Sequence, residues 1–340
     1  MSDPTQKQDE WHVEENPTSQ VSSSIATFAS WKQRIFTRKN IIIVTMVGVI
    51  SLALGLGLGI GLTRACPAGN PASDSKSSST PSPSATSSSS SSGSASIPQP
   101  SIGTTWDYPL GFSLTASNAN KSTKFYPVDL ENTSADTIAA LQSAGHTIVC
   151  YFSAGSVEDY RSDADAFPAS AIGNTLDGWP DEKWLDVRDA TVRSIMGKRI
   201  ALAKSKGCVG VDADNIDGYE NDPGFDLTED DAVEYVRYLA DTAHDAGLAY
   251  GLKNGGAIVE RVVDVAQWAI NEQCAEYQEC ADWAPFVKAG KPVFHVEYTD
   301  DDDATSVSSA EMQKACAADG QSGFSSIVKH TSLDNWVVYC

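Results

Sequence analysis

The sequence is poor in basic residues. Its 340 residues include 24 Lys and Arg against 45 Asp and Glu, so the formal net charge is −21. Because nucleic-acid binding depends on cations that neutralise phosphates, this balance argues against a nucleic-acid partner. The same negative field would concentrate cationic or neutral ligands near the surface. With 20% charged and 41% hydrophobic residues, the composition is still that of a globular protein.

Several signatures of metal and cofactor chemistry are also absent from the sequence. The five histidines have no metal-ligand spacing. Asp212, Asp214 and Asp217 have a spacing suited to oxygen ligands, but the segment lacks the glycine and the terminal glutamate at the positions that an EF-hand loop requires. No Gly-x-Ser-x-Gly elbow or phosphate-binding loop occurs. We therefore expect neither a metal ion nor a cofactor.

Residues 41–62 carry no charge, and such a run is long enough to cross a hydrocarbon core of roughly 30 Å as a helix. A cleavable signal peptide is the alternative, but its apolar region would be shorter and nearer the N-terminus. Basic residues cluster before the run, whereas only Arg64 follows it closely. The positive-inside rule then places the N-terminus in the cytoplasm. The sequence predicts a single-pass type II protein of the plasma membrane.

The remaining chain divides into three parts by composition. Residues 1–40 are polar and aperiodic, which predicts a disordered cytoplasmic tail. Residues 63–100 are rich in Ser and Pro and predict a flexible linker. Residues 101–340 are expected to form one folded extracellular domain. Glycosylation sequons at Asn120 and Asn132 are compatible with that location, and the sequence leaves the oligomeric state open.

Seven cysteines lie in or near the predicted extracellular part, where disulfides form. Cys66 lies beside the predicted span and is a candidate for palmitoylation or for pairing between chains. The expected assignment of the other six is Cys274 with Cys280, Cys316 with Cys340, and Cys150 and Cys208 as free, buried thiols.

Within residues 101–340, strand-like apolar runs alternate with amphipathic helical segments. Eight runs have this character: Pro109–Leu114, Thr147–Phe152, Trp184–Val187, Cys208–Asp214, Leu248–Lys253, Trp268–Glu272, Pro292–Tyr298 and Phe324–Lys329. The alternation is typical of α/β proteins with a parallel sheet. Eight units in this length predict a (β/α)8 barrel of the TIM type, and an open doubly wound sheet is the alternative.

Acidic, amide and aromatic residues gather where the predicted strands end. In a TIM-type barrel, residues at the carboxyl ends of the strands form the active site. The candidate ligands and catalysts at these ends are Asp186, Asp212, Asp214, Lys253, Asn254, Asn271, Glu272, Glu297 and Tyr298. We therefore expect an acidic site that contains one lysine.

Four of these segments together resemble glycoside hydrolase family 114, the endo-α-1,4-polygalactosaminidases. The segments are Trp184–Arg188, Cys208–Tyr219, Tyr250–Asn254 and Trp268–Cys274. The resemblance covers about residues 104–330 and implies a (β/α)8 barrel that hydrolyses α-1,4-linked galactosamine, as in galactosaminogalactan. It also implies an acidic pair at Asp214 and Glu272.

Hydrolysis of a glycosidic bond needs two such carboxyl groups. We expect Asp214 to act as nucleophile or electrostatic stabiliser and Glu272 as general acid/base.

The other candidates are expected to bind substrate, each with a structural alternative. Asp212 shares a strand face with Asp214, so it can instead lie deeper as a partner of that residue. The alternative for Asp186 is an ion pair with Arg188, and for Lys253 a structural ion pair. Asn254 and Glu297 are placed in the site by position alone. Tyr298 is the preferred aromatic for stacking on a sugar, ahead of Tyr151 and Trp179.

Charge links the expected fold to the expected substrate. Residues 101–340 hold 17 of the basic and 39 of the acidic residues. An acidic cleft favours a polysaccharide with free amines, which is cationic. Two alternatives remain open: a noncatalytic, membrane-tethered carbohydrate receptor or wall sensor, and a glycosidase for another α-linked polysaccharide.

Overall fold

The computed structural model describes residues 97–299 and 301–340. The predicted tail, the predicted span at 41–62 and nearly all of the predicted linker lie outside the described residues. Within the described ranges, no helix combines the length and apolar character needed to cross a membrane.

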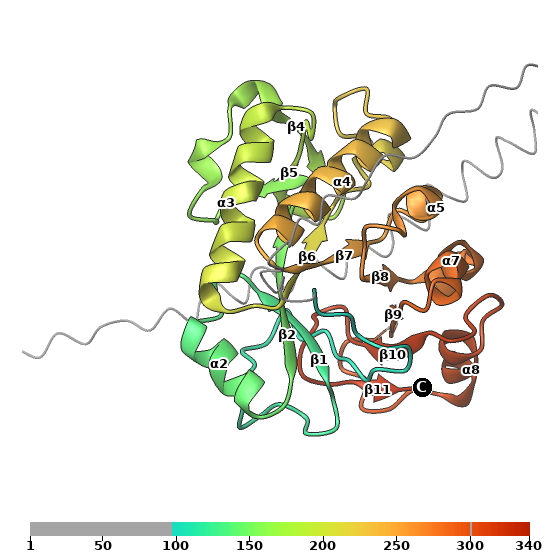
Figure 1. Cartoon of the computed structure of the whole chain (residues 1–340). Helices are drawn as coiled ribbons and strands as arrows, with labels where there is room; N and C mark the ends of the chain where they lie inside the picture. Colours follow the sequence, from blue (N-terminus) through green and yellow to red (C-terminus); the bar gives the residue numbers. More distant parts are fainter. Residues whose placement is uncertain (1–96, 300) are drawn as a thin grey trace, which may run out of the picture. The chain divides into compact units, whose positions relative to one another are not determined.

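The main sheet has eight strands that lie side by side in an almost sequential order (Figure 1). They are β1 (Phe125–Asp129), β2 (Thr147–Ser153), β6 (Gly210–Asp214), β7 (Ala249–Lys253), β8 (Trp268–Glu272), β9 (Val293–Tyr298), β10 (Ser325–Lys329) and β11 (Val338–Tyr339). The first seven pair in parallel, whereas β11 runs antiparallel to β10. The fold is therefore α/β with a curled parallel sheet, consistent with the TIM type.

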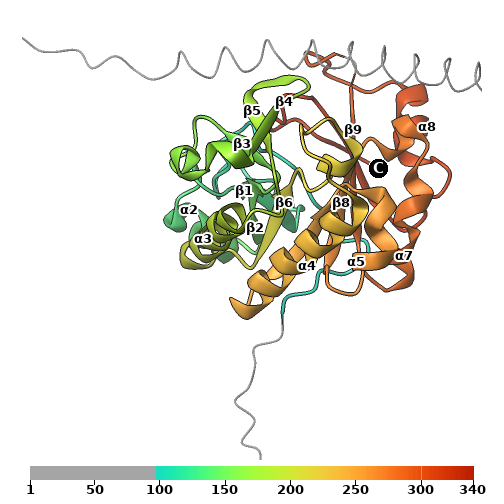
Figure 2. The same ribbon diagram turned by 90° about the horizontal axis from the view of Figure 1, so that it is seen from above.

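Helices lie around the outside of this curved sheet (Figure 2). The longer ones are α2 (Ala135–Ser143), α3 (Ala190–Lys206), α4 (Glu229–Asp245) and α8 (Ser309–Cys316), and the short ones are α5 (Val259–Val262), α6 (Cys274–Tyr277) and α7 (Ala284–Lys288). Single turns of 3-10 helix, η1 to η5, span Ala164–Ala166, Ala169–Ala171, Gly218–Glu220, Gly256–Ile258 and Cys280–Trp283. Helix α3 ends at Gly207, whose φ of 91° is left-handed and suits glycine.

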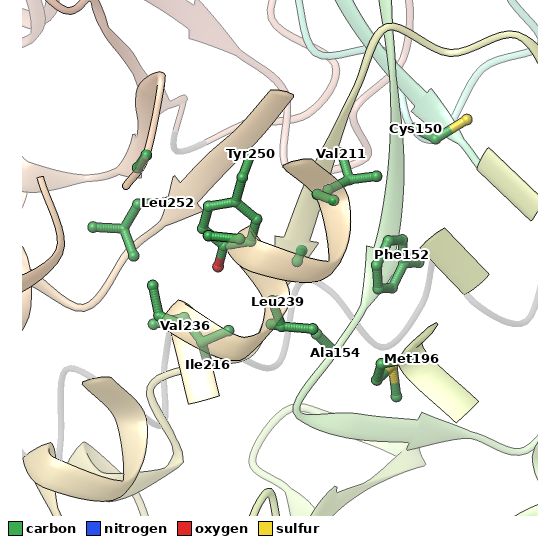
Figure 3. Packing of buried hydrophobic residues seen from close by; sticks show 14 of the residues in the cluster. Cys150, Phe152, Ala154, Met196, Val211, Ile216, Val236, Leu239, Tyr250 and Leu252 are labelled. Carbon is green, nitrogen blue, oxygen red and sulfur yellow. The ribbon is translucent and has the colours of Figure 1, made fainter. Parts of the chain in front are cut away.

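The side chains of each strand alternate between two cores. Phe152, Val211 and Leu252 point outward and share a cluster with Met196 of α3 and Leu239 of α4 (Figure 3). The inward-facing side chains form a second cluster inside the curved sheet: Trp106, Tyr108, Phe125, Val149, Ala249, Trp268, Ile270, Phe294, Val296 and Ile327. The interior is thus packed below the carboxyl ends of the strands, as expected for this fold.

Six of the eight predicted strands are present as parallel strands, and two predictions are wrong. Pro109–Leu114 forms no strand. Instead, Trp106 makes an isolated bridge to Phe125 of β1, and its indole Nε1 donates to the Ser325 carbonyl of β10. Strand β1 itself was not predicted.

The segment Trp184–Val187 is not a third parallel strand. It belongs largely to β5 (Trp179–Leu185), which pairs antiparallel with β3 (Ser156–Glu158) and β4 (Ile172–Leu176) in a small separate sheet. This sheet is an insertion between β2 and α3, so it interrupts the βα repeat that the prediction assumed.

The disulfides confirm two predicted pairs and correct one prediction. Cys274–Cys280 and Cys316–Cys340 are bonded as expected. Cys150 and Cys208 are not free but form a third disulfide. The two residues are 58 positions apart in the sequence. They come together because β2 and β6 are neighbours in the sheet, and the small inserted sheet hides that adjacency in the sequence.

Candidate active site

Four neighbouring strands deliver inward-facing polar side chains to the same edge of the sheet. Strands β6, β7 and β8 end in Asp214, Lys253 and Glu272, and β9 ends in Tyr298. Because strand side chains alternate with a period of two, each of these residues faces inward above the apolar cluster. The sequence therefore places two acids, one base and one phenol at the carboxyl edge of the curved sheet.

Lys253 joins the two acids. Its Nζ lies 3.1 Å from Asp214 Oδ1 and 3.0 Å from Glu272 Oε2. The two carboxylate oxygens therefore lie no more than about 6 Å apart, a range in which two carboxyl groups can act on one glycosidic bond. Lys253 is 1% exposed, whereas the carboxylates keep some contact with solvent. Burial opposes the charge of Lys253, but the nearby acids raise its pKa well above the usual value.

Glu272 is held by several donors in addition to Lys253. Asn254 Nδ2 donates to Oε2 at 3.1 Å, and the Tyr298 hydroxyl donates to Oε1. Burial alone would raise the pKa of Glu272, but Lys253 and the two other donors lower it below its usual value. Glu272 is therefore a carboxylate in the free protein at neutral pH.

Asp214 is fixed at both of its oxygens. The Tyr151 hydroxyl donates to Oδ2 at 2.8 Å, and the backbone N–H of Asn215 donates to Oδ1 at 2.8 Å. With Lys253 also at Oδ1, three of about four acceptor positions of this carboxylate are used. One position on Oδ2 remains for a ligand.

Asp212 lies directly below Asp214 on the same face of β6. It is fully buried, and its Oδ2 accepts a hydrogen bond from the Tyr108 hydroxyl at 3.0 Å. Burial raises the pKa of Asp212 to about 7, and the charge of Asp214 adds to the rise while Lys253 opposes it. Because Asp212 is completely buried, it lies beneath the site. This position matches the alternative given for Asp212, a deeper partner of Asp214.

Two tyrosines complete the wall around Lys253. The Lys253 ammonium lies 5.3 Å from the ring centre of Tyr108 and 5.9 Å from that of Tyr151, within the range of cation–π attraction. Tyr108 lies two residues after Trp106, whose bridge to β1 was not predicted. The sequence pattern therefore gave no reason to place Tyr108 in the site. Tyr151 was a weaker candidate for sugar stacking, and its hydroxyl instead contacts Asp214.

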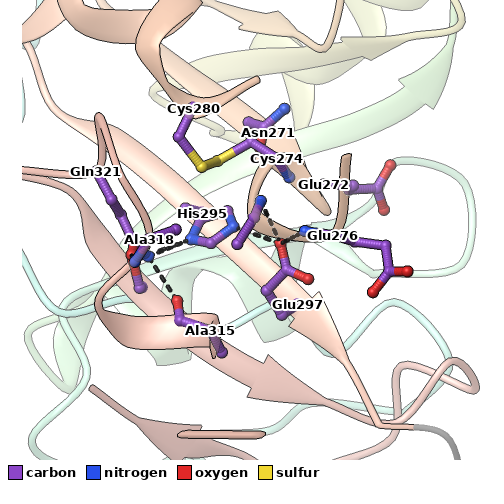
Figure 4. Close-up of a disulfide and its surroundings, with 12 residues drawn as sticks. Asn271, Glu272, Cys274, Glu276, Cys280, His295, Glu297, Ala315, Ala318 and Gln321 are labelled. Atoms are coloured by element: carbon purple, nitrogen blue, oxygen red, sulfur yellow. Dashed lines mark hydrogen bonds and ion pairs between the residues drawn. A yellow bond between two sulfur atoms is a disulfide. The ribbon is translucent and has the colours of Figure 1, made fainter. Parts of the chain in front are cut away.

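Glu297 does not join this group. It precedes Tyr298 within β9, so its side chain faces away from the interior. Its Oε1 accepts from the backbone N–H of Ala275 at 2.9 Å and lies 2.9 Å from His295 Nε2 (Figure 4). Glu297 thus holds the start of α6, behind the strand that carries Glu272. The same alternation turns Asn271 away, and its Oδ1 accepts from Cys274 N.

Asp186 pairs with a neighbouring residue, and Asp217 is buried near Asp214. Asp186 forms an ion pair with Arg188 at 2.8 Å, which was its structural alternative, and this pairing lowers its pKa. Asp217 precedes η3, yet its side chain makes no capping hydrogen bond. Burial, with Asp214 nearby, raises the pKa of Asp217 to about 7.

One group of side chains in the described ranges has metal-ligand proximity. Cys274, Cys280 and His295 bring one potential ligand atom each within 4.8 Å of the others. The two cysteines are joined in a disulfide, so neither offers the thiolate that a metal ion needs.

A second acidic pair lies beside the site and was not predicted. Glu158 of β3 and Glu182 of β5 face each other directly across the strand pair, and both are buried. Glu158 is neutralised by Arg161 at 2.7 Å, whereas Glu182 accepts a hydrogen bond from the Ser156 hydroxyl at 2.8 Å. Burial, followed by the charge of Glu158, raises the pKa of Glu182 to about 8.

This pair predicts a dependence of stability on pH. Glu182 is protonated in the folded state below about pH 8 but ionises in the unfolded state near its usual pKa of 4.5. The free energy of unfolding should therefore fall as pH rises through this window, by at most about 1.4 kcal/mol per pH unit. The variant Glu182→Gln should lack this fall and exceed the wild type in stability at pH 8.

Denaturant titrations at pH 5, 6.5 and 8 would measure the effect, with Asp181→Asn as the exposed neighbouring control. Parallel stability curves for Glu182→Gln and the wild type would contradict the assignment of a neutral Glu182.

Comparison with known proteins adds to this geometry. The family model of Glycoside-hydrolase family GH114 matches residues 86–340. The crystal structure of Aspergillus fumigatus Ega3 in complex with galactosamine is 44% identical in sequence, with a TM-score of 0.69. That match covers 72% of this chain and 98% of the Ega3 chain.

A more distant match shows the fold alone. The glycoside hydrolase domain of PelA from Pseudomonas aeruginosa is 16% identical, with a TM-score of 0.52, over 69% of this chain and 97% of that domain. No curated protein matches the chain significantly. Every residue of the site described above lies within the range that the family model matches.

Proposed function

The chain belongs to glycoside-hydrolase family GH114, and from that premise we propose that it cleaves α-1,4-linked galactosamine within a cationic polysaccharide. It is a glycoside hydrolase, and the two carboxylates that share Lys253 are the observation that carries the proposal. Galactosamine is the ligand of the 44% identical Ega3 structure, which supports an amino-sugar substrate. The polymer resembles galactosaminogalactan in having free amines.

The proposed chemistry uses Asp214 and Glu272 as the two carboxyl groups. One protonates the leaving oxygen, and the other attacks the anomeric carbon or activates water. Both carboxylates contact the ammonium of Lys253, so the two carboxyl groups lie close together. A short separation favours direct attack by one carboxylate on the anomeric carbon, and therefore retention of configuration.

The roles of the two acids can be assigned in two ways. The sequence assigned the acid to Glu272, but a general acid should be protonated before reaction, and the donors around Glu272 lower its pKa. Glu272 as acid therefore requires the bound sugar to weaken these contacts, whereas Glu272 as nucleophile does not.

The fold and location are proposed on related grounds. We regard the sheet as a TIM-type barrel in which the segment at Trp106 stands in place of the first strand. Ile97, at the start of the described chain, packs on the cluster inside the sheet, below the acids. Residues 41–62, the proposed membrane span, precede this domain in the sequence. This arrangement suits a single-pass type II protein with an extracellular catalytic domain.

The proposal predicts selectivity for charged polymer. The domain holds far more acidic than basic residues, so the rate should fall when the polymer is N-acetylated and when salt screens its amines. Reducing-end release should be measured with the folded domain on deacetylated and acetylated α-1,4-galactosamine polymers at 0.05 and 0.5 M salt. We expect each change to lower the rate about tenfold, which corresponds to a loss of about 1.4 kcal/mol of electrostatic attraction between the domain and the polymer.

The outcome separates the remaining alternatives. Equal rates on both polymers would remove the role of charge. Binding without cleavage would favour a receptor, and cleavage of a different α-linked polymer would favour another glycosidase. Neither alternative is favoured by a specific contact among residues 97–299 and 301–340.

A further inference from the structure

Asn215, which follows the acid Asp214, has an unusual backbone conformation. Its φ is 60°, in the left-handed region that asparagine tolerates better than most residues. In this conformation its backbone N–H turns back and donates to Asp214 Oδ1 at 2.8 Å. The same oxygen contacts Lys253 Nζ, so the Asn215 N–H and the lysine together fix the direction of the carboxylate.

The side chain of Asn215 is anchored in a buried network. Its Nδ2 donates to Ser153 Oγ at 2.9 Å. Ser153 and Ser156 are fully buried, their hydroxyl oxygens lie 2.5 Å apart, and Ser156 donates to Glu182. The anchor therefore rests on β2 and β3 and not on solvent-exposed groups.

Close backbone packing restricts the same turn from the other side. The backbone of Gly155 approaches the Asn215 carbonyl so closely that a Cβ at position 155 would lie 1.6 Å from that oxygen. The N–H groups of Ala154 and Gly155 also donate to the Asp214 carbonyl, at 2.8 and 3.1 Å. Both polar groups of the peptide between Asp214 and Asn215 are therefore hydrogen-bonded: its carbonyl accepts from Ala154 and Gly155, and its N–H donates to Asp214 Oδ1.

The geometry points to Asn215 as a positioning residue, whose backbone N–H aims the Asp214 carboxylate and whose side chain, anchored on Ser153, keeps that N–H in place. This inference concerns the site of the proposed hydrolysis and rests on that function for its kinetic test. Asn254 provides a parallel at the second acid. It is also left-handed, with a φ of 50°, but it contacts Glu272 through its side chain.

The test compares Asn215→Ala with Asn215→Gly. Both variants remove the side-chain anchor on Ser153. Glycine keeps the left-handed backbone without strain, so the N–H can still reach Asp214, whereas alanine also disfavours that conformation. We expect kcat on the deacetylated polymer to fall about 10- to 100-fold in Asn215→Ala with little change in KM, since a small misplacement of a reacting group has effects of this size. Asn215→Gly, which loses the anchor but keeps the backbone conformation, should show a smaller loss in kcat, of about three- to tenfold.

Crystal structures of both variants give a readout that needs no activity. The Asp214 carboxylate should turn away from Lys253 in Asn215→Ala and keep the contact in Asn215→Gly. If the wild-type domain cuts no polymer, the proposed substrate is wrong. The distance between Asp214 Oδ1 and Lys253 Nζ in the two variants still decides the role of Asn215.

Gln278→Ala is the matched control, because Gln278 is also left-handed, with a φ of 60°, but is exposed and not part of the site. It should affect thermal stability alone. Equal kinetic losses in both Asn215 variants, or an unmoved Asp214 in Asn215→Ala, would overturn the inference.

Discussion

Asp214→Asn and Glu272→Gln should each abolish nearly all release of reducing ends from deacetylated galactosamine polymer. Each variant keeps the size and most hydrogen bonds of the original side chain but can neither donate a proton as an acid nor attack as a carboxylate. Loss of acid/base assistance alone costs about 10²- to 10⁴-fold in kcat, and loss of a nucleophile should cost no less. Binding of the polymer should persist, because the site keeps its shape.

An activated aryl galactosaminide distinguishes the roles of the two acids. A good leaving group needs little protonation, so the variant that lacks the general acid should still release the aryl alcohol in a burst and then stall. The variant that lacks the nucleophile should show no burst, and added azide should restore turnover with inverted product.

The lowered pKa of Glu272 favours its being the nucleophile, whereas the sequence assigned it the acid role. A burst in Glu272→Gln would therefore support the sequence-based assignment, and a burst in Asp214→Asn the reverse. Asn221→Ala, on an exposed loop near the site, serves as a control for folding. Full activity in either acid variant would refute the assignment of the pair.

The βα repeat was readable because buried parallel strands are continuous apolar runs that end abruptly. Strands β6, β7 and β8 each end in a charged residue, and the sequence placed all three together. The segment at Trp106 has no such signal, because it contributes one bridge and an indole hydrogen bond in place of a ladder. Tyr108 was missed for the same reason.

Side-chain direction at the strand ends was the harder part of the prediction. Glu297 and Tyr298 are consecutive residues within β9, so only one of them can face inward. Lys253 and Asn254 are also consecutive, yet both reach Glu272 because the strand stops at Lys253 and Asn254 turns into the left-handed region. A sequence pattern does not show where a ladder ends to within one residue. The inserted sheet that carries Glu182 was not predicted, because its antiparallel strands do not alternate with helices.

Lys253→Met should have the largest combined effect on stability and activity. Lys253 is 1% exposed and contacts both acids, so its removal leaves carboxylates close together without a counter-charge. Breaking a buried ion pair from one side costs about 3–5 kcal/mol, and we expect a loss of that order at pH 7. Removal of the lysine should also raise the pKa of Glu272, because Lys253 is the main group that lowers it.

The sign of the pH dependence separates this charge effect from a packing defect. In the wild type, the lowered pKa of Glu272 contributes stability above the unfolded-state pKa, and that contribution is lost as pH falls through the folded-state value. In Lys253→Met, Glu272 becomes protonated at higher pH, so the variant regains stability relative to the wild type on acidification. The difference in the free energy of unfolding should therefore shrink between pH 7 and pH 4, whereas the cost of a cavity would not change.

Lys329→Met is the matched control for Lys253→Met. Lys329 is also fully buried and pairs with Asp107 at 2.7 Å, but it contacts neither Asp214 nor Glu272. Both variants should lose stability, whereas only Lys253→Met should move the acidic limb of the pH profile of kcat/KM upward, because that limb reports a carboxylate that Lys253 keeps ionised. An unchanged profile in Lys253→Met would mean that the lysine stabilises the fold without tuning the acids. Measurement of both profiles on one activated substrate decides the point.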